Sequence, residues 1–194
     1  TQWMNNETME ESALWPPGYP ILLGAAGSVG RFLGFPLVFS TQVLQILLWI
    51  LCLWCFHRLT KHLLISRFAK WLSFTLFSCF PTLTAFSHFL WPEIAHLTCY
   101  LLVFVILQEE RLKLSQGLIL GLLLAAASLL KLVFLPIMLG IFIYLIWRMF
   151  KKHGSLLSHM TPIVIVVLIL GSVGLRNHER YGIWLPADSS AFNL

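Results

Sequence analysis

The sequence predicts an all-α integral membrane protein, a polytopic helical bundle, from three observations. Hydrophobic residues make up 58% of the 194 residues and charged residues only 11%, against about 25% charged residues in an average soluble domain. The apolar runs are too long and too continuous for the alternating strands of a membrane barrel, so helices must satisfy the backbone within the hydrocarbon. Basic residues gather in the short loops between the runs, as they do on the cytoplasmic side of membrane proteins.

The first segment, residues 1–14, is a polar lead-in with acidic and no basic residues. The sequence WPPGYP then stands at 15–20, directly before an apolar run. Proline costs little in a first helical turn, and Trp and Tyr favour the level of the lipid headgroups. We expect a partial or interfacial helix over 15–34, because its apolar part, 21–33, is shorter than the ~20 residues that a span needs.

The remaining apolar runs predict about six membrane spans. They lie at residues 36–56, 71–90, 94–107, 116–130, 132–147 and 161–175. The membrane domain therefore extends over 15–175, and residues 176–194 form a tail outside the bilayer.

The distribution of positive charge sets the orientation. With the loop after Phe56 placed inside, nine of the 13 basic residues fall in cytoplasmic loops. These nine are Arg58, Lys61, Arg67, Lys70, Arg111, Lys113, Arg148, Lys151 and Lys152. The same assignment places WPPGYP, the tripeptide at 91–93, Lys131 and the tail on the non-cytoplasmic face. The net charge of +5 thus reflects loop asymmetry, and no nucleic-acid partner is expected.

Lys131 is the most informative residue in the apolar region. A lysine between AAASLL and LVFLP costs roughly 2.5–3.5 kcal/mol in hydrocarbon on insertion scales, so such residues usually face a bundle interior or a cavity and hold a partner. Two readings remain open: a cation for an anionic group such as a lipid phosphate, or a lysine that extends to the interface from a helix end. One long tilted helix through Lys131 is also possible, although Pro136 and the need to hydrate the ammonium favour a turn.

Glu93 follows Trp91 and Pro92 at a predicted outer turn. It is a candidate base, metal ligand or charge partner, or else a first-turn acid that complements a helix dipole. Glu93 and His96 share the ExxH spacing of carboxylate-bridged metal sites, but such a site needs a second motif and further carboxylates. No metal site is therefore predicted.

Cys52 and Cys55 form a CxxC motif inside the apolar run 36–56. A redox or metal role needs an accessible thiolate, whereas thiols in such a run act as small hydrophobic groups. We expect these cysteines to face lipid or packed helix.

Four segments resemble motifs of one family, in the same order along the chain. They are WPPGYPILLGAAGSVGRFLG (15–34), FPTLTAFSHFLWPEIAHLTCYLLVF (80–104), LLLAAASLLKLVFLPIML (122–139) and LRNHERYGIWLPADSSAFNL (175–194). They are similar to the polyprenyl-phosphate-sugar glycosyltransferases with the GT-C fold, which include protein O-mannosyltransferase-like and aminoarabinose-transferase-like enzymes. The resemblance covers nearly the whole chain and implies the membrane domain of such an enzyme.

The resemblance also implies a function. A membrane glycosyltransferase, or part of one, would move a sugar from a polyprenyl-phosphate lipid to a lipid or protein hydroxyl on the periplasmic or luminal face. Lys131 and Arg176 match basic positions of the family and would bind the donor phosphate, and Glu93 matches its second acidic position and is a candidate catalytic residue. The substrate pocket would be formed by Tyr19, Asn177, Tyr181 and Asn193. No cofactor is certain, and a divalent metal remains open.

The chain departs from the family pattern in several places. The loop that carries the family's catalytic base should lie well upstream of WPPGYP, and Glu7, Glu10 and Glu11 match no motif in that loop. His178 replaces an aromatic residue, and the segment 189–191 replaces a glycine-containing turn. We therefore expect a fragment, or a reduced relative that has lost or borrows its base, and the base remains unassigned.

Two other functional classes stay open. A non-catalytic membrane subunit or scaffold would keep the same helices for packing alone. A transporter would account for Lys131 and for spans interrupted by glycine and proline, but no inverted repeat is visible.

Overall fold

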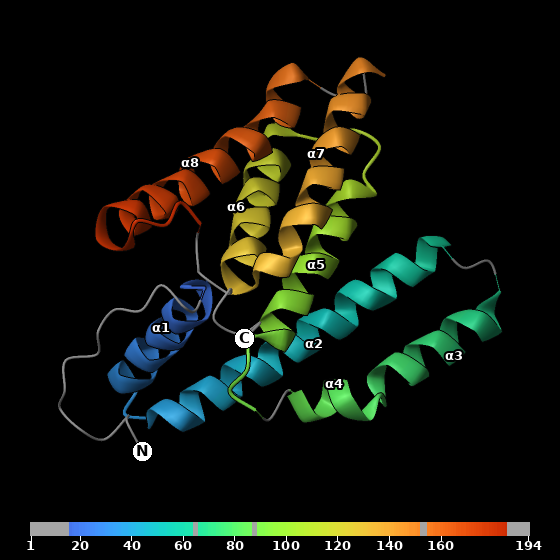
Figure 1. The fold of residues 1–194 in the computed structure, drawn as a ribbon. Helices are drawn as coiled ribbons and strands as arrows, with labels where there is room; N and C mark the ends of the chain where they lie inside the picture. The colour runs from blue at the N-terminus through green and yellow to red at the C-terminus, as the bar shows by residue number, and fades with distance from the viewer. Residues whose placement is uncertain (1–15, 64–65, 87–88, 152–154, 186–194) are drawn as a thin grey trace, which may run out of the picture.

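The computed structural model describes residues 16–63, 66–86, 89–151 and 155–185, and the regular structure in these residues is helical (Figure 1). The helices are α1 (Gly18–Phe32), α2 (Leu37–Leu63), α3 (Arg67–Ser78), α4 (Pro81–Phe86), α5 (Glu93–Leu107), α6 (Leu114–Leu130), α7 (Leu135–Phe150) and α8 (Leu156–Tyr181). A 3-10 turn, η2, occupies Leu132–Phe134 between α6 and α7. The prediction of an all-α chain is confirmed.

Three stretches of helix are long and apolar enough to cross a membrane. They are Leu37–Lys61, Leu132–Phe150 and Leu156–Arg180. The helices α5 and α6 are also apolar but shorter, at 15 and 17 residues. Large apolar side chains are exposed along α2, α7 and α8, as expected of surfaces that face lipid. The count of about six spans stays a prediction.

The predicted span at 71–90 is divided in the structure, because α3 ends at Ser78 and α4 begins at Pro81. Proline lacks an N–H, and its ring clashes with the carbonyl four residues earlier, so a helix kinks or breaks there. The Thr84 hydroxyl donates to the carbonyl oxygen of Ser78, the last residue of α3, at 3.4 Å, which gives one carbonyl at the break a partner. Within its described residues the predicted span at 71–90 therefore consists of two helices, and its crossing of the membrane stays a prediction.

The helices α6 and α7 form an antiparallel hairpin whose turn consists of Lys131 and η2 (Figure 1). Lys131 has an extended backbone, with φ −151° and ψ 125°, and this conformation ends α6 at Leu130. Pro136 lies in the first turn of α7, where proline is tolerated. The predicted turn at Lys131 is confirmed, and the alternative of one long helix through it is wrong.

The core of the bundle lies between α5, α6, α7 and α8. Its most buried apolar side chains include Val103, Leu120, Leu124, Phe134, Leu145 and Val166. The helix α8 crosses α6 at two glycines: a Cβ at Gly117 would lie 2.5 Å from the carbonyl oxygen of Ser158, and one at Gly121 would lie 2.9 Å from Pro162 Cα. Small residues at these positions allow the two backbones to approach each other closely.

The bundle has two ends, because α5 and α7 run in one direction and α6 in the other (Figure 1). The Lys131 end contains the start of α5, the end of α6 and η2. The Arg148 end contains the end of α5 and the end of α7. The helix α2 packs along α5, and α1 packs against α2 and the end of α6.

Arg148 holds its end of the bundle together. Its side chain is 3% exposed, and the guanidinium donates to the carbonyl oxygens of Leu107, Glu109 and Glu110 at 3.0, 2.5 and 2.7 Å. Carbonyls at the end of a helix have no partner within the helix, and the planar fork of arginine supplies several donors at once. Arg148 therefore fastens the end of α5 to α7.

Gly117→Ala should destabilise the protein, because the added methyl group must displace the backbone of α8. We expect a loss of about 1–3 kcal/mol in the free energy of unfolding, seen as a lower midpoint of thermal unfolding in detergent. Gly140→Ala in α7 is the matched control, since no other described segment lies within 4 Å of its Cβ position, and it should leave the midpoint unchanged or raise it. Equal effects of the two substitutions would contradict the close crossing.

Arg148→Met should lower the midpoint of thermal unfolding further. Each buried carbonyl left without a donor costs about 1 kcal/mol or more, so we expect a total loss of at least about 3 kcal/mol. Arg148→Lys keeps the charge without the planar fork and should restore only part of the stability. The control is Lys151→Met, at an exposed position one helical turn away. An equal loss of stability in this variant would show that removal of a positive charge, and not loss of the hydrogen bonds of Arg148, lowers the midpoint of unfolding.

Candidate functional site

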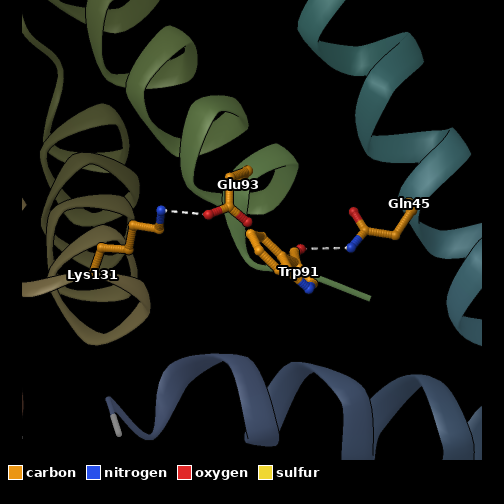
Figure 2. A network of polar contacts seen from close by, with 4 residues as sticks. All are labelled: Gln45, Trp91, Glu93 and Lys131. Carbon is orange, nitrogen blue, oxygen red and sulfur yellow. Dashed lines mark hydrogen bonds and ion pairs between the residues drawn. The ribbon is translucent and has the colours of Figure 1, made fainter. Parts of the chain in front are cut away.

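The Lys131 end gathers polar groups from four segments (Figure 2). They are the start of α1, the first half of α2, the residues 89–93 that lead into α5, and the turn after α6. The sequence predicts that WPPGYP, the tripeptide at 91–93 and Lys131 share one face, and the structure brings these three segments together.

Glu93 and Lys131 form an ion pair, with Lys131 Nζ 2.6 Å from Glu93 Oε1. Glu93 is the first residue of α5, and Lys131 directly follows the last residue of α6. Each charge therefore lies at the helix end whose dipole favours it, the carboxylate at an N-terminus and the ammonium at a C-terminus. The side chain of Lys131 is 34% exposed and that of Glu93 is 21% exposed, so the pair is partly shielded from the surroundings of the protein.

This geometry shows what the two charged residues contact. Lys131 holds a carboxylate rather than only extending to the interface, and Glu93 is both a charge partner and a first-turn acid. Among the described residues, no group of three His, Cys, Asp or Glu side chains is placed to hold a metal ion.

Gln45 connects α2 to the loop before α5. Its side chain is 1% exposed, and Nε2 donates to the Trp91 carbonyl oxygen at 2.8 Å and also lies 3.4 Å from the Phe89 carbonyl oxygen and 3.1 Å from the Tyr19 hydroxyl. Carbonyl oxygens only accept hydrogen bonds, so these contacts settle which end of the amide is nitrogen. Sequence reasoning assigned no role to Gln45. Its only signal was a polar side chain within the apolar run 36–56, where such a group needs a partner.

WPPGYP reaches this end through Gly18. A Cβ at Gly18 would lie 2.7 Å from the carbonyl of Leu129 in α6, so glycine is required for α1 to begin this close to α6. Burial raises the pKa of the neighbouring Tyr19 above its ordinary value, the hydrogen bond from Gln45 lowers it, and the charge of Glu93 raises it. Tyr19 therefore stays neutral and keeps its hydroxyl proton.

Three buried polar atoms at this end have no hydrogen-bond partner among the described residues. They are Gln45 Oε1, Glu93 Oε2 and His96 Nε2. His96 follows Glu93 by about one helical turn, and its ring packs edge-on against the rings of Tyr100 and Phe134, with centroids 4.7 and 5.8 Å away. A buried polar atom without a partner costs about 1–3 kcal/mol, and in native sites water or a ligand commonly supplies one.

Arg176 and Asn177 were expected beside Lys131, and the described contacts do not place them there. Asn177 is buried and donates to the Leu185 carbonyl oxygen at 2.8 Å, while Arg176 is exposed. The ion pair of Lys131 is with Glu93 in α5. The reason is the path of α8, which crosses α6 at Gly117 and Gly121 and then diverges from it, so that its last turns lie away from the end of α6 (Figure 1).

The other predicted residues are placed only in part. Tyr181 is the last residue of α8, and Asn193 lies outside the described residues, as do the three glutamates of the lead-in. Cys52 and Cys55 are fully buried, and Cys52 Sγ lies 3.1 Å from Thr98 Oγ1. Of the two surroundings expected for these thiols, lipid or packed helix, the structure shows packed helix.

No family model, curated protein or solved structure matches this chain. The class that the fold and the site define is an all-helical protein with three membrane-length apolar helices and a charged, hydrogen-bonding cluster at one end of its bundle.

Lys131→Met should destabilise the protein, because it leaves the Glu93 carboxylate without its counter-charge. We expect a loss of about 1–3 kcal/mol, and the double variant Glu93→Gln/Lys131→Met should recover much of it, since replacing both partners removes the unpaired charge. Thermal unfolding of both single variants and the double variant gives the coupling energy of the pair. Effects that add to within about 0.5 kcal/mol would mean that the two side chains do not interact.

Proposed function

We propose that this protein is a membrane glycosyltransferase, or part of one, that takes a sugar from a polyprenyl-phosphate lipid and transfers it to a lipid or protein hydroxyl on the non-cytoplasmic face. The observation that carries the proposal is the environment of the Lys131 ammonium. It lies at a helix break, and exposed apolar side chains stand two residues from each partner of the ion pair: Val133, after Lys131, is 69% exposed, and Trp91, before Glu93, is 55% exposed. An anionic head group on a long apolar chain has the chemistry that suits this boundary.

The Lys131 ammonium can bind a phosphate without losing Glu93. A lysine has three N–H donors, and Glu93 Oε1 accepts one of them. Two donors remain for phosphate oxygens, and a charge-assisted hydrogen bond to phosphate is about twice as strong as a neutral one. The pair therefore supports a pre-positioned cation rather than excluding a ligand.

The reaction would be glycosyl transfer. The acceptor hydroxyl oxygen bonds to the anomeric carbon of the sugar while the bond from that carbon to the phosphate oxygen breaks. The polyprenyl phosphate leaves with the electron pair of this bond, and Lys131 stabilises the charge that builds on it. The acceptor proton moves to a carboxylate that acts as general base.

Glu93 is the best candidate for that base among the acidic residues that the structure describes. Its Oε1 is held by Lys131, while Oε2 has no partner among these residues and can accept a proton. The residues Glu109 and Glu110 lie at the Arg148 end, where their backbone carbonyls bind Arg148.

The orientation follows from the loops at the two ends. Arg111, Lys113 and Lys151 lie in the loops of the Arg148 end. An excess of basic residues in short loops marks the cytoplasmic side, so the Lys131 end would face the opposite side of the membrane.

A non-catalytic membrane subunit is the second candidate. The observation that favours it is the ion pair itself, because Glu93 already neutralises Lys131 at 2.6 Å and would do so in a purely structural contact.

Lys131→Met should weaken the binding of a short-chain polyprenyl phosphate to the protein in nanodiscs of neutral lipid. Loss of charge-assisted hydrogen bonds worth about 1.5–3 kcal/mol corresponds to roughly 10- to 100-fold in Kd, measurable by native mass spectrometry. Lys131→Arg keeps the charge and should bind better than Lys131→Met.

The control variant is Lys151→Met, which removes a cation at the other end of α7, and the control ligand is the matching polyprenol without phosphate. Equal binding of the polyprenyl phosphate by the wild type and by Lys131→Met would reject the proposed donor site and support the non-catalytic subunit.

A further inference from the structure

The unpartnered atoms at the Lys131 end specify a ligand chemistry beyond phosphate. Four buried side-chain atoms have no partner among the described residues, and three of them, Gln45 Oε1, Glu93 Oε2 and His96 Nε2, belong to this end. The side chains of Gln45 and His96 are 1% and 8% exposed. Two of these side chains, Gln45 and Glu93, flank Trp91 from opposite sides (Figure 2).

The two oxygen atoms require a hydrogen-bond donor. An amide oxygen and a carboxylate oxygen only accept hydrogen bonds, and the carbonyl oxygens of Trp91 and Phe89 keep the Gln45 amide from reversing its oxygen and nitrogen. A phosphate offers mainly acceptors, so it cannot satisfy these two atoms. A cation is not required either, because Lys131 already balances the charge of Glu93.

Tyr19 contributes a hydrogen-bond donor. Its hydroxyl oxygen accepts a hydrogen bond from Gln45 Nε2 at 3.1 Å, which leaves the hydroxyl proton available as a donor. The acceptor Gln45 Oε1 and the donor on Tyr19, whose side chains are in contact, form the complement of hydroxyl groups, which both donate and accept.

We infer that Gln45 and Tyr19 form a hydroxyl-binding subsite that recognises the sugar of the donor, at the same end of the bundle as the ammonium that binds its phosphate, while Glu93 Oε2 is left for the acceptor hydroxyl. This inference rests on the proposed function and adds the residues that distinguish a glycosylated lipid from the bare polyprenyl phosphate. Gln45 determines specificity in this scheme, since one of its amide atoms anchors the site and the other is left for the ligand.

The test compares two ligands that differ only in the sugar: a short-chain polyprenyl phosphate and the same lipid carrying one hexose on its phosphate. The wild type in nanodiscs of neutral lipid should bind the hexosyl form about tenfold more tightly, because the hexose satisfies buried acceptors that otherwise lack a donor. Tyr19→Phe and Gln45→Met should bring the ratio of the two Kd values close to one, mainly through weaker binding of the hexosyl form.

The matched control is Thr41→Val, one helical turn before Gln45 on α2. Thr41 is also 1% exposed, but its hydroxyl donates to the Leu37 carbonyl oxygen of its own helix, so the ratio should keep its wild-type value. Tyr19→Phe deletes a single oxygen atom, so it tests the subsite even if Gln45→Met fails to fold. Thermal unfolding of each variant would reveal a loss of folding.

The outcomes distinguish failure of the hydroxyl subsite from failure of the donor-phosphate site. If both ligands bind through Lys131 but the ratio does not depend on Gln45 or Tyr19, the hydroxyl subsite is overturned and the donor-phosphate site stands. If the wild type binds neither ligand in a Lys131-dependent way, the proposed function and the subsite fall together.

Discussion

The ion pair between Lys131 and Glu93 is the contact on which the Lys131 end of the bundle depends. It exists because α6 stops at Leu130, which places an ammonium at the end of one apolar helix beside the carboxylate that begins another. A charge inside an apolar bundle is costly unless it is paired, and here each partner also lies at the helix terminus whose dipole favours it. The ion pair thus offsets the energetic cost of placing both charges in an apolar bundle. Two N–H donors of the ammonium and the oxygen Glu93 Oε2 are left without a partner among the described residues.

Close helix contacts determine which residues can join this pair. Gly18 lets α1 begin against the backbone of Leu129, which brings Tyr19 to Gln45. The glycines of α6 have the opposite consequence for the tail. They hold α8 tightly near the start of α6, and the later turns of α8 lie away from α6 (Figure 1). Backbone approach at a few small residues therefore decides that α1, and not the end of α8, contributes to the described site.

The helices and the turn at Lys131 could be predicted because hydropathy, Pro136 and the cost of an ammonium are local properties of the sequence. The same local signal failed at Pro81, where continuous hydropathy over 71–90 concealed a helix break. The pairing of Glu93 with Lys131 spans 38 residues, and it was not predicted, because the topology placed both residues on one face without joining them. Gln45 could not be found, because its role depends on the backbone oxygens of a loop more than 40 residues away. The divergence of α8 from α6 depends on the angle at which the two helices cross, and no residue pattern in the chain predicts that angle.

Arg148 and Lys131 lie at opposite ends of the bundle, and their surroundings suit them to different roles. Arg148 is almost fully buried, and its donors go to three backbone carbonyls that need them. Its burial leaves little of the guanidinium accessible to a ligand, so the residue is suited to holding helices together. The side chain of Lys131 is 34% exposed, and its ammonium donates one hydrogen bond among the described residues, to Glu93. Three buried polar atoms at the same end of the bundle have no partner among these residues. Such atoms cost stability unless water or a ligand completes them, and that cost is the physical reason for proposing a binding site at the Lys131 end.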